Sequence, residues 1–373
     1  LALMSLVAFA GGIQNTHQKF TVPAFTPVLF NLSLIIAAVF VAPYYDMPIY
    51  VLAWGVLLAG FLQLLIQISP LMSIDRLPIP KLDFKNKGVK RFITLILPAI
   101  LAGGIFQINL LIDTIFASIL ETGSPTWLYV SDRLIQFPLG IFAIAIGTVL
   151  LPTLSKYDLN YEKNKFIQSI KNGQRFVLFI GIPSLIGLFF CAEDIISTIF
   201  YRGAFTKIDV IKSSYSLMAF SLGLPFFMLM KVLTPAFFSR KDTKTPMIVA
   251  LISLILNVLF NYFLAFVIGL GHVGIALGSS IAALISVCIL EIILYKDGFI
   301  KLNSMFNKFN AMILVASSFL IIFLNFYSQS INFIDLDQLD RIIFLVIEVT
   351  MAIFIYFSIS RIIFGKPLKT ILG

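Results

Sequence analysis

Four polar side chains interrupt two apolar segments of this chain and could bind a cation. Asp113 lies in the run FQINLLIDTIFAS, and Asn109 precedes it by one helical turn on the same face. Asn257 and Asn261 are also one turn apart, in LNVLFNYF, at a depth that would let the two pairs meet. A carboxylate with amide oxygens suits Na⁺ or a proton, so we predict an ion-coupling site. The alternative is that these groups only hydrogen-bond neighbouring helices.

A second polar group surrounds Arg133 in WLYVSDRLIQFPLG, where a permanently charged guanidinium could hold a phosphate through two parallel hydrogen bonds. Asp132 and Gln136 accompany it, and Pro138 would kink the helix beside it. We predict that these polar side chains line a cavity for an anionic substrate. Lys231, in LMKVLTP, is a second candidate cation for that cavity. The alternative for both cations is that their long side chains reach towards lipid headgroups.

Motifs of ATP-driven and hydrolytic proteins are missing from the sequence. It contains no GxxxxGK[ST], which excludes a P-loop ATPase. His17 and His272 would lie at opposite membrane faces, so they could not share a metal ion or a catalytic triad. Cys191 and Cys288 lie in apolar runs without paired spacing, which indicates neither a disulfide nor a zinc site. We therefore expect that the protein is not an enzyme and that it binds no cofactor, apart from Na⁺ or H⁺ as a coupling ion.

Ten long apolar segments must position these residues. Their length and composition indicate that they span a membrane. Of 373 residues, 59% are hydrophobic and 12% charged, about half the charged fraction of a soluble domain. A spanning helix needs about 20 apolar residues. The predicted spans are 25–43, 49–72, 92–120, 127–151, 176–200, 213–236, 246–270, 272–295, 311–328 and 342–364. Residues 1–12 resemble the end of another span, so we expect a fragment that begins partway through a membrane helix.

Positive charge is concentrated in every second gap between the predicted spans. The basic gaps are 13–24, 73–91, 152–175, 237–245, 296–310 and the C-terminal tail, whereas the alternate gaps are acidic. The positive-inside rule places the basic gaps and the C-terminus in the cytoplasm. This distribution accounts for the net charge of +9 through topology and anionic lipid, and we expect no nucleic-acid partner.

The run from Pro98 to Ser155 carries a longer pattern, QIN…D…AS followed by GS…W.Y..DRL..FP.G…GT.LLP.LS. This pattern closely resembles the MurJ (MviN) lipid II flippase family of the multidrug/oligosaccharidyl-lipid/polysaccharide exporter superfamily. The runs NTHQKFTVPAFTPVLFN and KVLTPAFFSRKDTKTP match it as well. The resemblance extends over essentially the entire chain.

The resemblance implies an all-α polytopic membrane protein, with two lobes of helices around a central cavity and two further C-terminal helices. Family members have fourteen helices. Residues 1–72 would be the remainder of the N-terminal lobe (helices 4–6), 92–295 the C-terminal lobe (helices 7–12) and 311–364 the extra pair (helices 13–14). That pair would form a groove for a lipid tail. On this alignment the first three helices and most of the fourth lie outside the chain.

The implied activity is movement of lipid II, the undecaprenyl-diphosphate-linked disaccharide-peptide, between the leaflets of the bacterial inner membrane. It would run from the cytoplasmic to the periplasmic leaflet by alternating access, driven by an ion gradient or the membrane potential. Lipid II, membrane lipids and the cell-wall synthesis machinery are the implied partners. Arg133 matches an essential cavity arginine of the family. Some relatives have Glu in place of Gln136, and relatives vary at Asn257 and Asn261.

Three other functions are compatible with parts of the sequence. The same architecture could export another lipid-linked oligosaccharide, or drugs by cation antiport, and carboxylates rather than arginines should then line the cavity. A membrane-embedded enzyme, such as a lipid-linked sugar ligase, would need a large external loop, and no gap between the spans is long enough. A scaffold protein without transport activity is the third alternative.

Overall fold

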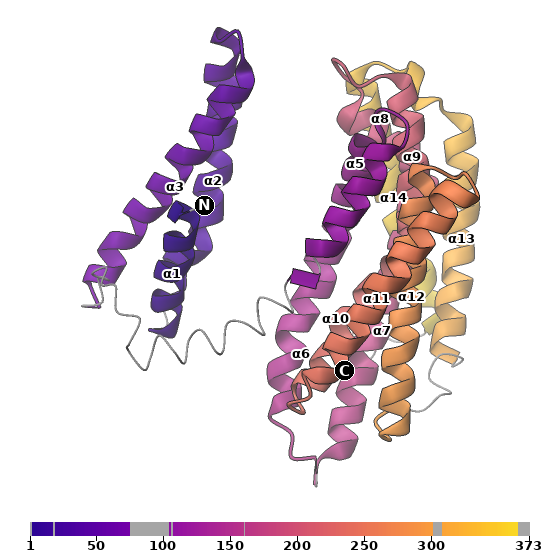
Figure 1. Cartoon of the computed structure of the whole chain (residues 1–373). Helices are drawn as coiled ribbons and strands as arrows, with labels where there is room; N and C mark the ends of the chain where they lie inside the picture. Colours follow the sequence, from indigo (N-terminus) through magenta and orange to yellow (C-terminus); the bar gives the residue numbers. More distant parts are fainter. Residues whose placement is uncertain are drawn as a thin grey trace. The chain divides into compact units, whose positions relative to one another are not determined.

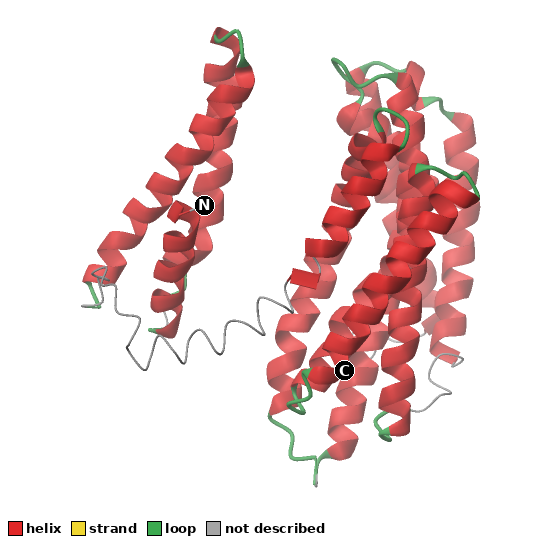
Figure 2. Ribbon diagram, viewed as in Figure 1, coloured by secondary structure: helices red, strands yellow, loops and turns green. Residues whose placement is uncertain are grey.

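The computed structural model describes residues 2–17, 19–74, 104–105, 107–159, 161–300 and 308–364. Every regular element in these ranges is a helix (Figure 2), so the predicted all-α class is confirmed. Eight of the described helices are long and apolar enough to cross a membrane, and a bent pair makes a ninth candidate. The chain divides into two compact units, Leu1–Ile93 and Thr94–Gly373.

Long helices make up the described part of the first unit (Figure 1). They are α1 (Ala2–Thr16), α2 (Thr21–Ile36) and α3 (Pro48–Met72), and α2 continues through a π-helical turn, Ala37–Val41, and a 3-10 turn, Ala42–Tyr44. Small residues lie where α3 contacts its neighbours. A Cβ added to Gly55 would lie 2.9 Å from the Cβ of Ala37, and one added to Gly60 would lie 3.1 Å from the Cβ of Leu3. Such residues let membrane helices approach closely.

The second unit begins, in its described part, with the apolar helix Gln107–Ile119. It continues with α5 (Ser124–Pro138), the π-helix η3 (Leu139–Ile144), α6 (Ala145–Ser155), α7 (Lys163–Phe190), α8 (Ala192–Phe200), α9 (Lys207–Ser221), α10 (Leu224–Phe238), α11 (Lys244–Tyr262), the π-helix η4 (Phe263–Val267), α12 (His272–Lys296), α13 (Lys308–Ser330), the 3-10 turn η6 (Phe333–Asp335) and α14 (Gln338–Phe364). The last helix, α14, packs against α13, α8 and α7.

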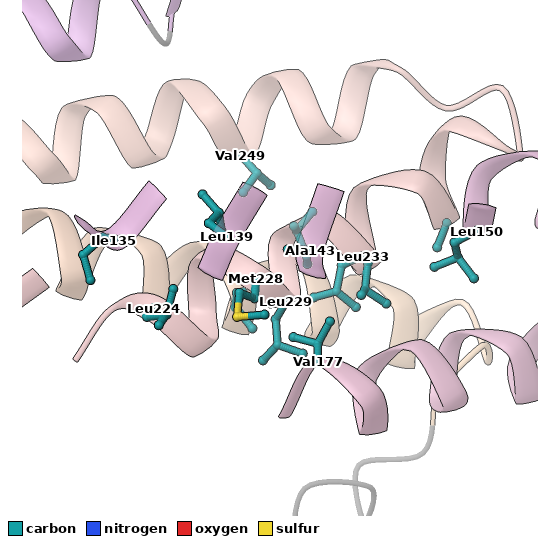
Figure 3. Packing of buried hydrophobic residues seen from close by; sticks show 14 of the residues in the cluster. Ile135, Leu139, Ala143, Leu150, Val177, Leu224, Met228, Leu229, Leu233 and Val249 are labelled. Atoms are coloured by element: carbon teal, nitrogen blue, oxygen red, sulfur yellow. The ribbon is translucent and has the colours of Figure 1, made fainter. Parts of the chain in front are cut away.

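The core of this unit lies where η3, α7 and α10 meet (Figure 3). Two glycines of α7 bring its backbone close to α10. A Cβ added to Gly173 would lie 3.0 Å from Val232, and one added to Gly181 would lie 3.1 Å from the sulfur of Met228. Because lipid is as apolar as these side chains, close packing rather than escape from water holds the helices together.

The predicted span 176–200 is wrong at both ends. Its helix, α7, runs from Lys163 to Phe190, and the separate helix α8 follows Cys191. The basic residues up to Arg175, predicted as a connector, are helical, because a helix satisfies its own backbone in water as well as in lipid. At the other end, Glu193 and Asp194 lie in the first turn of α8, where a helix N-terminus favours negative charge.

Three more predicted spans differ from the structure or lie partly outside it. The span 213–236 is a pair, α9 and α10, bent by 40°. The bend lies beside Pro225, which lacks a backbone N–H, and at Gly223, where a Cβ would lie 2.6 Å from the Oγ of Ser280. The span 127–151 is longer, Ser124–Ser155, and turns π-helical after Pro138. Of the span 92–120, residues 92–103 and 106 lie outside the described residues.

Candidate functional site

One hydrogen-bonded group, here called the amide–carboxylate cluster, contains all four residues of the predicted ion site: Asn109, Asp113, Asn257 and Asn261. The Nδ2 of Asn261 donates to Asp113 Oδ1 at 2.6 Å and to Asn257 Oδ1 at 2.9 Å. Asn109 Nδ2 donates to Asp113 Oδ2 at 3.4 Å. Asn257 in turn donates to the Oγ of Ser279 on α12 at 2.9 Å. Three helical segments of the second unit therefore meet at these side chains.

Helix geometry and one close approach position the cluster. Asn257 and Asn261 are four residues apart on α11, so both project from one face, and both are buried. Gly278 on α12 lies against them, because a Cβ at that position would collide with the Oδ1 of Asn261. Neither Gly278 nor Ser279 was predicted. The small-residue run at 278–280 was the signal that the next helix approaches closely here.

The cluster contains one ionisable group, Asp113, and has unused oxygen atoms. The Oδ1 atoms of Asn109 and Asn261 are buried and accept no hydrogen bond in the described part of the chain. No Lys or Arg among the described residues forms an ion pair with Asp113. Asp132 on α5 is close enough to repel its carboxylate electrostatically. An ionised carboxylate in this setting needs a cation, or else takes up a proton.

Arg133 lies on a face of α5 that the second unit does not cover. Tyr129, Arg133 and Phe137 follow at intervals of four residues, and all three are exposed within this unit. The guanidinium carbon lies 4.8 Å from the centroid of the Tyr129 ring, which is a cation–π contact. Within the described ranges Arg133 forms no ion pair. Its N–H donors are therefore available to an anion.

The other residues of the predicted anion cavity, Asp132, Gln136 and Lys231, form no hydrogen bond or ion pair with Arg133 in the described part of the chain. Gln136 Nε2 donates to Asp132 Oδ1 at 3.3 Å, one turn apart on α5. Lys231 is exposed on α10 and has no ion-pair partner among the residues that the structure describes. Of these four residues, two are exposed cations and two form a hydrogen-bonded pair, and no hydrogen bond or ion pair of the described residues joins Arg133 to Lys231.

A group that the sequence did not predict links α5, α9 and α12. Trp127 Nε1 donates to Asp209 Oδ1 at 2.7 Å, and its ring meets that of His272 edge-on, with centroids 4.8 Å apart. The Nδ1 of His272 and the Oγ of Ser216 lie 2.6 Å apart. His272 therefore has structural partners. In the ranges that the structure describes, no group of three His, Cys, Asp or Glu residues could hold a metal ion.

These helices define a class of protein: a polytopic α-helical membrane protein that carries ionisable side chains within its apolar segments. The sequence matches the family described as "Lipid II flippase MurJ" over residues 1–336. The chain therefore belongs to the MurJ family, and the resemblance found in its sequence is confirmed.

Individual relatives agree with this membership. A probable lipid II flippase MurJ of Vibrio cholerae is 42% identical over 290 residues, which are 78% of this chain and 55% of that protein. One of Haemophilus influenzae is 37% identical over 363 residues, 95% of this chain and 71% of that protein. A solved structure described as lipid II flippase MurJ in an inward closed conformation has a TM-score of 0.78 and 28% identity, and the match covers 97% of this chain and 72% of that one. The chain thus spans just over half the length of the Vibrio cholerae relative.

Proposed function

We propose that this protein is a lipid II flippase, which moves the lipid-linked cell-wall precursor from the cytoplasmic to the periplasmic leaflet of the bacterial inner membrane. The observation that carries the proposal is the family match over residues 1–336. The exposed guanidinium of Arg133, which has no counter-ion among the described residues, is the feature of this chain that best fits an anionic substrate.

The chemistry of the substrate explains why such a protein needs polar side chains. The diphosphate, sugars and peptide cannot cross hydrocarbon unaided, whereas the polyprenyl tail can stay in lipid. Arg133 and Lys231 would hold the diphosphate, and the arginine could do so through two parallel hydrogen bonds. Asp132 and Gln136 would add acceptors and donors for the sugars and peptide. The segments 1–72 and 92–295 would act as two lobes that rock around this cavity, and 311–364 would guide the tail.

The amide–carboxylate cluster would couple transport to an ion. Na⁺ or a proton would neutralise Asp113, and the free amide oxygens of Asn109 and Asn261 would complete the ligands of a sodium ion. The membrane potential would add to the drive, because it favours export of an anion by about 2.3 kcal/mol per charge per 100 mV. A head with two negative charges would gain several kcal/mol. Transport driven in this way needs no enzymatic step.

Replacement of Arg133 by Ala should reduce lipid II export roughly 30-fold or more, since loss of one partner of a desolvated charge pair costs about 2 kcal/mol or more. The measurement uses bacteria depleted of their own flippase. They would express this protein in its place. Lipid II in the outer leaflet is then scored with an externally added degrading enzyme.

Arg202→Ala is the matched control, because Arg202 is also an exposed arginine but follows α8 in a loop. Its export should equal that of the wild type. Normal export by a well-inserted Arg133→Ala variant would contradict the cavity role. A well-inserted wild type that exports no lipid II but confers drug efflux would favour the cation-antiport alternative.

A further inference from the structure

Three exposed side chains form a stripe along α5, here called the α5 stripe: Tyr129, Arg133 and Phe137. Tyr129 is 59% exposed and Phe137 is 70% exposed within the second unit, and Arg133 is exposed between them. The proposed function gives a task to Arg133 alone. The two aromatic residues lie one helical turn on either side of it, so each is close enough in the helix to influence how the guanidinium is held.

Of the two rings, only that of Tyr129 forms a cation–π contact with Arg133 among the described residues. The guanidinium carbon lies 4.8 Å from the centroid of the Tyr129 ring, and no such contact joins it to Phe137. The reason is the direction of long side chains on a helix, which point back over the preceding turn. Arg133 therefore reaches the ring four positions before it rather than the ring four positions after it.

The contact with Tyr129 occupies the face of the guanidinium and leaves its edge free. Arginine stacks on aromatic rings through the face of its planar group, whereas its five N–H donors point outwards in that plane. A carboxylate partner would instead occupy the donors themselves. Asp132, the acidic neighbour in the chain, accepts a hydrogen bond from Gln136 at 3.3 Å and forms no ion pair with Arg133 in the described ranges. An anion can thus take the donors of Arg133 without displacing a carboxylate.

We propose that Tyr129 is a positioning residue, whose ring fixes the guanidinium of Arg133 so that its N–H edge is presented to the diphosphate of a lipid-linked substrate. This inference rests on the proposed function, because the diphosphate is the anion that Arg133 is proposed to hold. A mobile arginine side chain loses rotamer entropy when it binds a ligand, and a ring that holds it beforehand removes part of that cost. The role requires the aromatic ring and does not require the tyrosine hydroxyl.

Binding of farnesyl diphosphate, which carries a diphosphate on a short prenyl chain, to the full chain in lipid nanodiscs tests this role. Tyr129→Leu removes the ring and should lower the affinity roughly fivefold or more, which is the effect of an exposed to partly desolvated cation–π contact. Tyr129→Phe keeps the ring and should restore the wild-type affinity. Phe137→Leu is the matched control from the α5 stripe and should bind like the wild type. Equal affinity of Tyr129→Leu and the wild type, or an equal loss in Tyr129→Phe and Tyr129→Leu, would overturn the proposal.

The effect of Tyr129 should pass through Arg133, and a double-mutant cycle tests this dependence. In an Arg133→Ala background, Tyr129→Leu should cause no further loss of affinity, since two residues that act as one unit are not additive. A further loss of similar size in that background would show that the ring contacts the ligand itself. That result would overturn the positioning role.

Arginine side-chain NMR of the ligand-free protein tests the contact between Tyr129 and Arg133 directly. The Nε–Hε signal of Arg133, identified by its absence in Arg133→Ala, should be shifted upfield by the ring. This shift should be lost in Tyr129→Leu and kept in Tyr129→Phe. An unshifted signal in the wild type would overturn the proposal and leave the proposed function intact. A wild type that binds no farnesyl diphosphate would instead refute the anion site of the proposed function, and this inference with it.

Discussion

Asp113 and Glu348 show two ways in which a single carboxyl group persists among apolar helices. Asp113 accepts hydrogen bonds from Asn109 and Asn261. Glu348 is fully buried beside the Cys191 thiol. The first arrangement, with its unused amide oxygens, suits an exchangeable cation.

Replacement of Asp113 by Asn should preserve the shape of the amide–carboxylate cluster and remove its charge. We expect transport that no longer responds to a sodium or proton gradient, with a rate roughly tenfold lower, which is the effect of about 1.4 kcal/mol. Lipid II export in vesicles with imposed gradients provides the measurement. Thr114→Ala is the control, because Thr114 is exposed on the same helix. Its hydroxyl donates to the carbonyl oxygen of Leu110, one turn earlier in that helix. Unchanged gradient dependence in Asp113→Asn would exclude coupling at this cluster.

Residue spacing predicted part of these arrangements and could not predict the rest. Asn257 and Asn261 were recognised because one helical turn separates two polar residues in an apolar run. The hydrogen bond between Trp127 and Asp209 was not, because it joins helices far apart in the chain. Such partners depend on which helices pack together, and an apolar run does not specify its neighbour. Only small-residue runs such as 278–280 indicate close approach.

At the scale of helices, the length of an apolar run predicted that a helix exists better than it predicted where that helix begins and ends. The segments 49–72 and 272–295 nearly coincide with α3 and α12, since hydrocarbon thickness sets both the apolar length and the helix length. The beginning of α7 was missed because a helix continues beyond the bilayer into a basic segment. Apolar length did not show the bend between α9 and α10, because the hydrophobicity is continuous across Gly223. Pro225, which lacks a backbone N–H, was the sequence signal of a kink there.

Gly278→Ala should destabilise the contact between α11 and α12 by about 1–3 kcal/mol, because the added methyl group would collide with the Oδ1 of Asn261. The matched control is Gly187→Ala in α7, where a Cβ would meet nothing within 4 Å. That change should be neutral or slightly stabilising, since alanine favours a helix over glycine. Thermal unfolding of the purified variants compares them. Equal stability of the two variants would show that α12 does not need its close approach at Gly278.

At the scale of the whole molecule, charge distribution sets how the protein lies in the membrane and hence which way an anion would be driven. Lys156 follows α6 in a basic gap, whereas Arg202 follows α8, whose first turn contains Glu193 and Asp194. The positive-inside rule predicts that the first position lies in the cytoplasm and the second outside. A membrane potential negative inside then favours movement of an anionic head from the Lys156 side to the Arg202 side.

Single cysteines at these two exposed positions test the orientation. In a chain with Cys191 and Cys288 replaced by serine, a membrane-impermeant thiol reagent should label Arg202→Cys in intact spheroplasts. Lys156→Cys should be labelled only after the membrane is permeabilised. The reverse pattern would contradict the assigned topology, and the membrane potential would then oppose export of a negatively charged head. An ion gradient acting through the amide–carboxylate cluster would in that case have to supply the whole driving force. The labelling result therefore decides what share of the free energy for transport the ion gradient must provide.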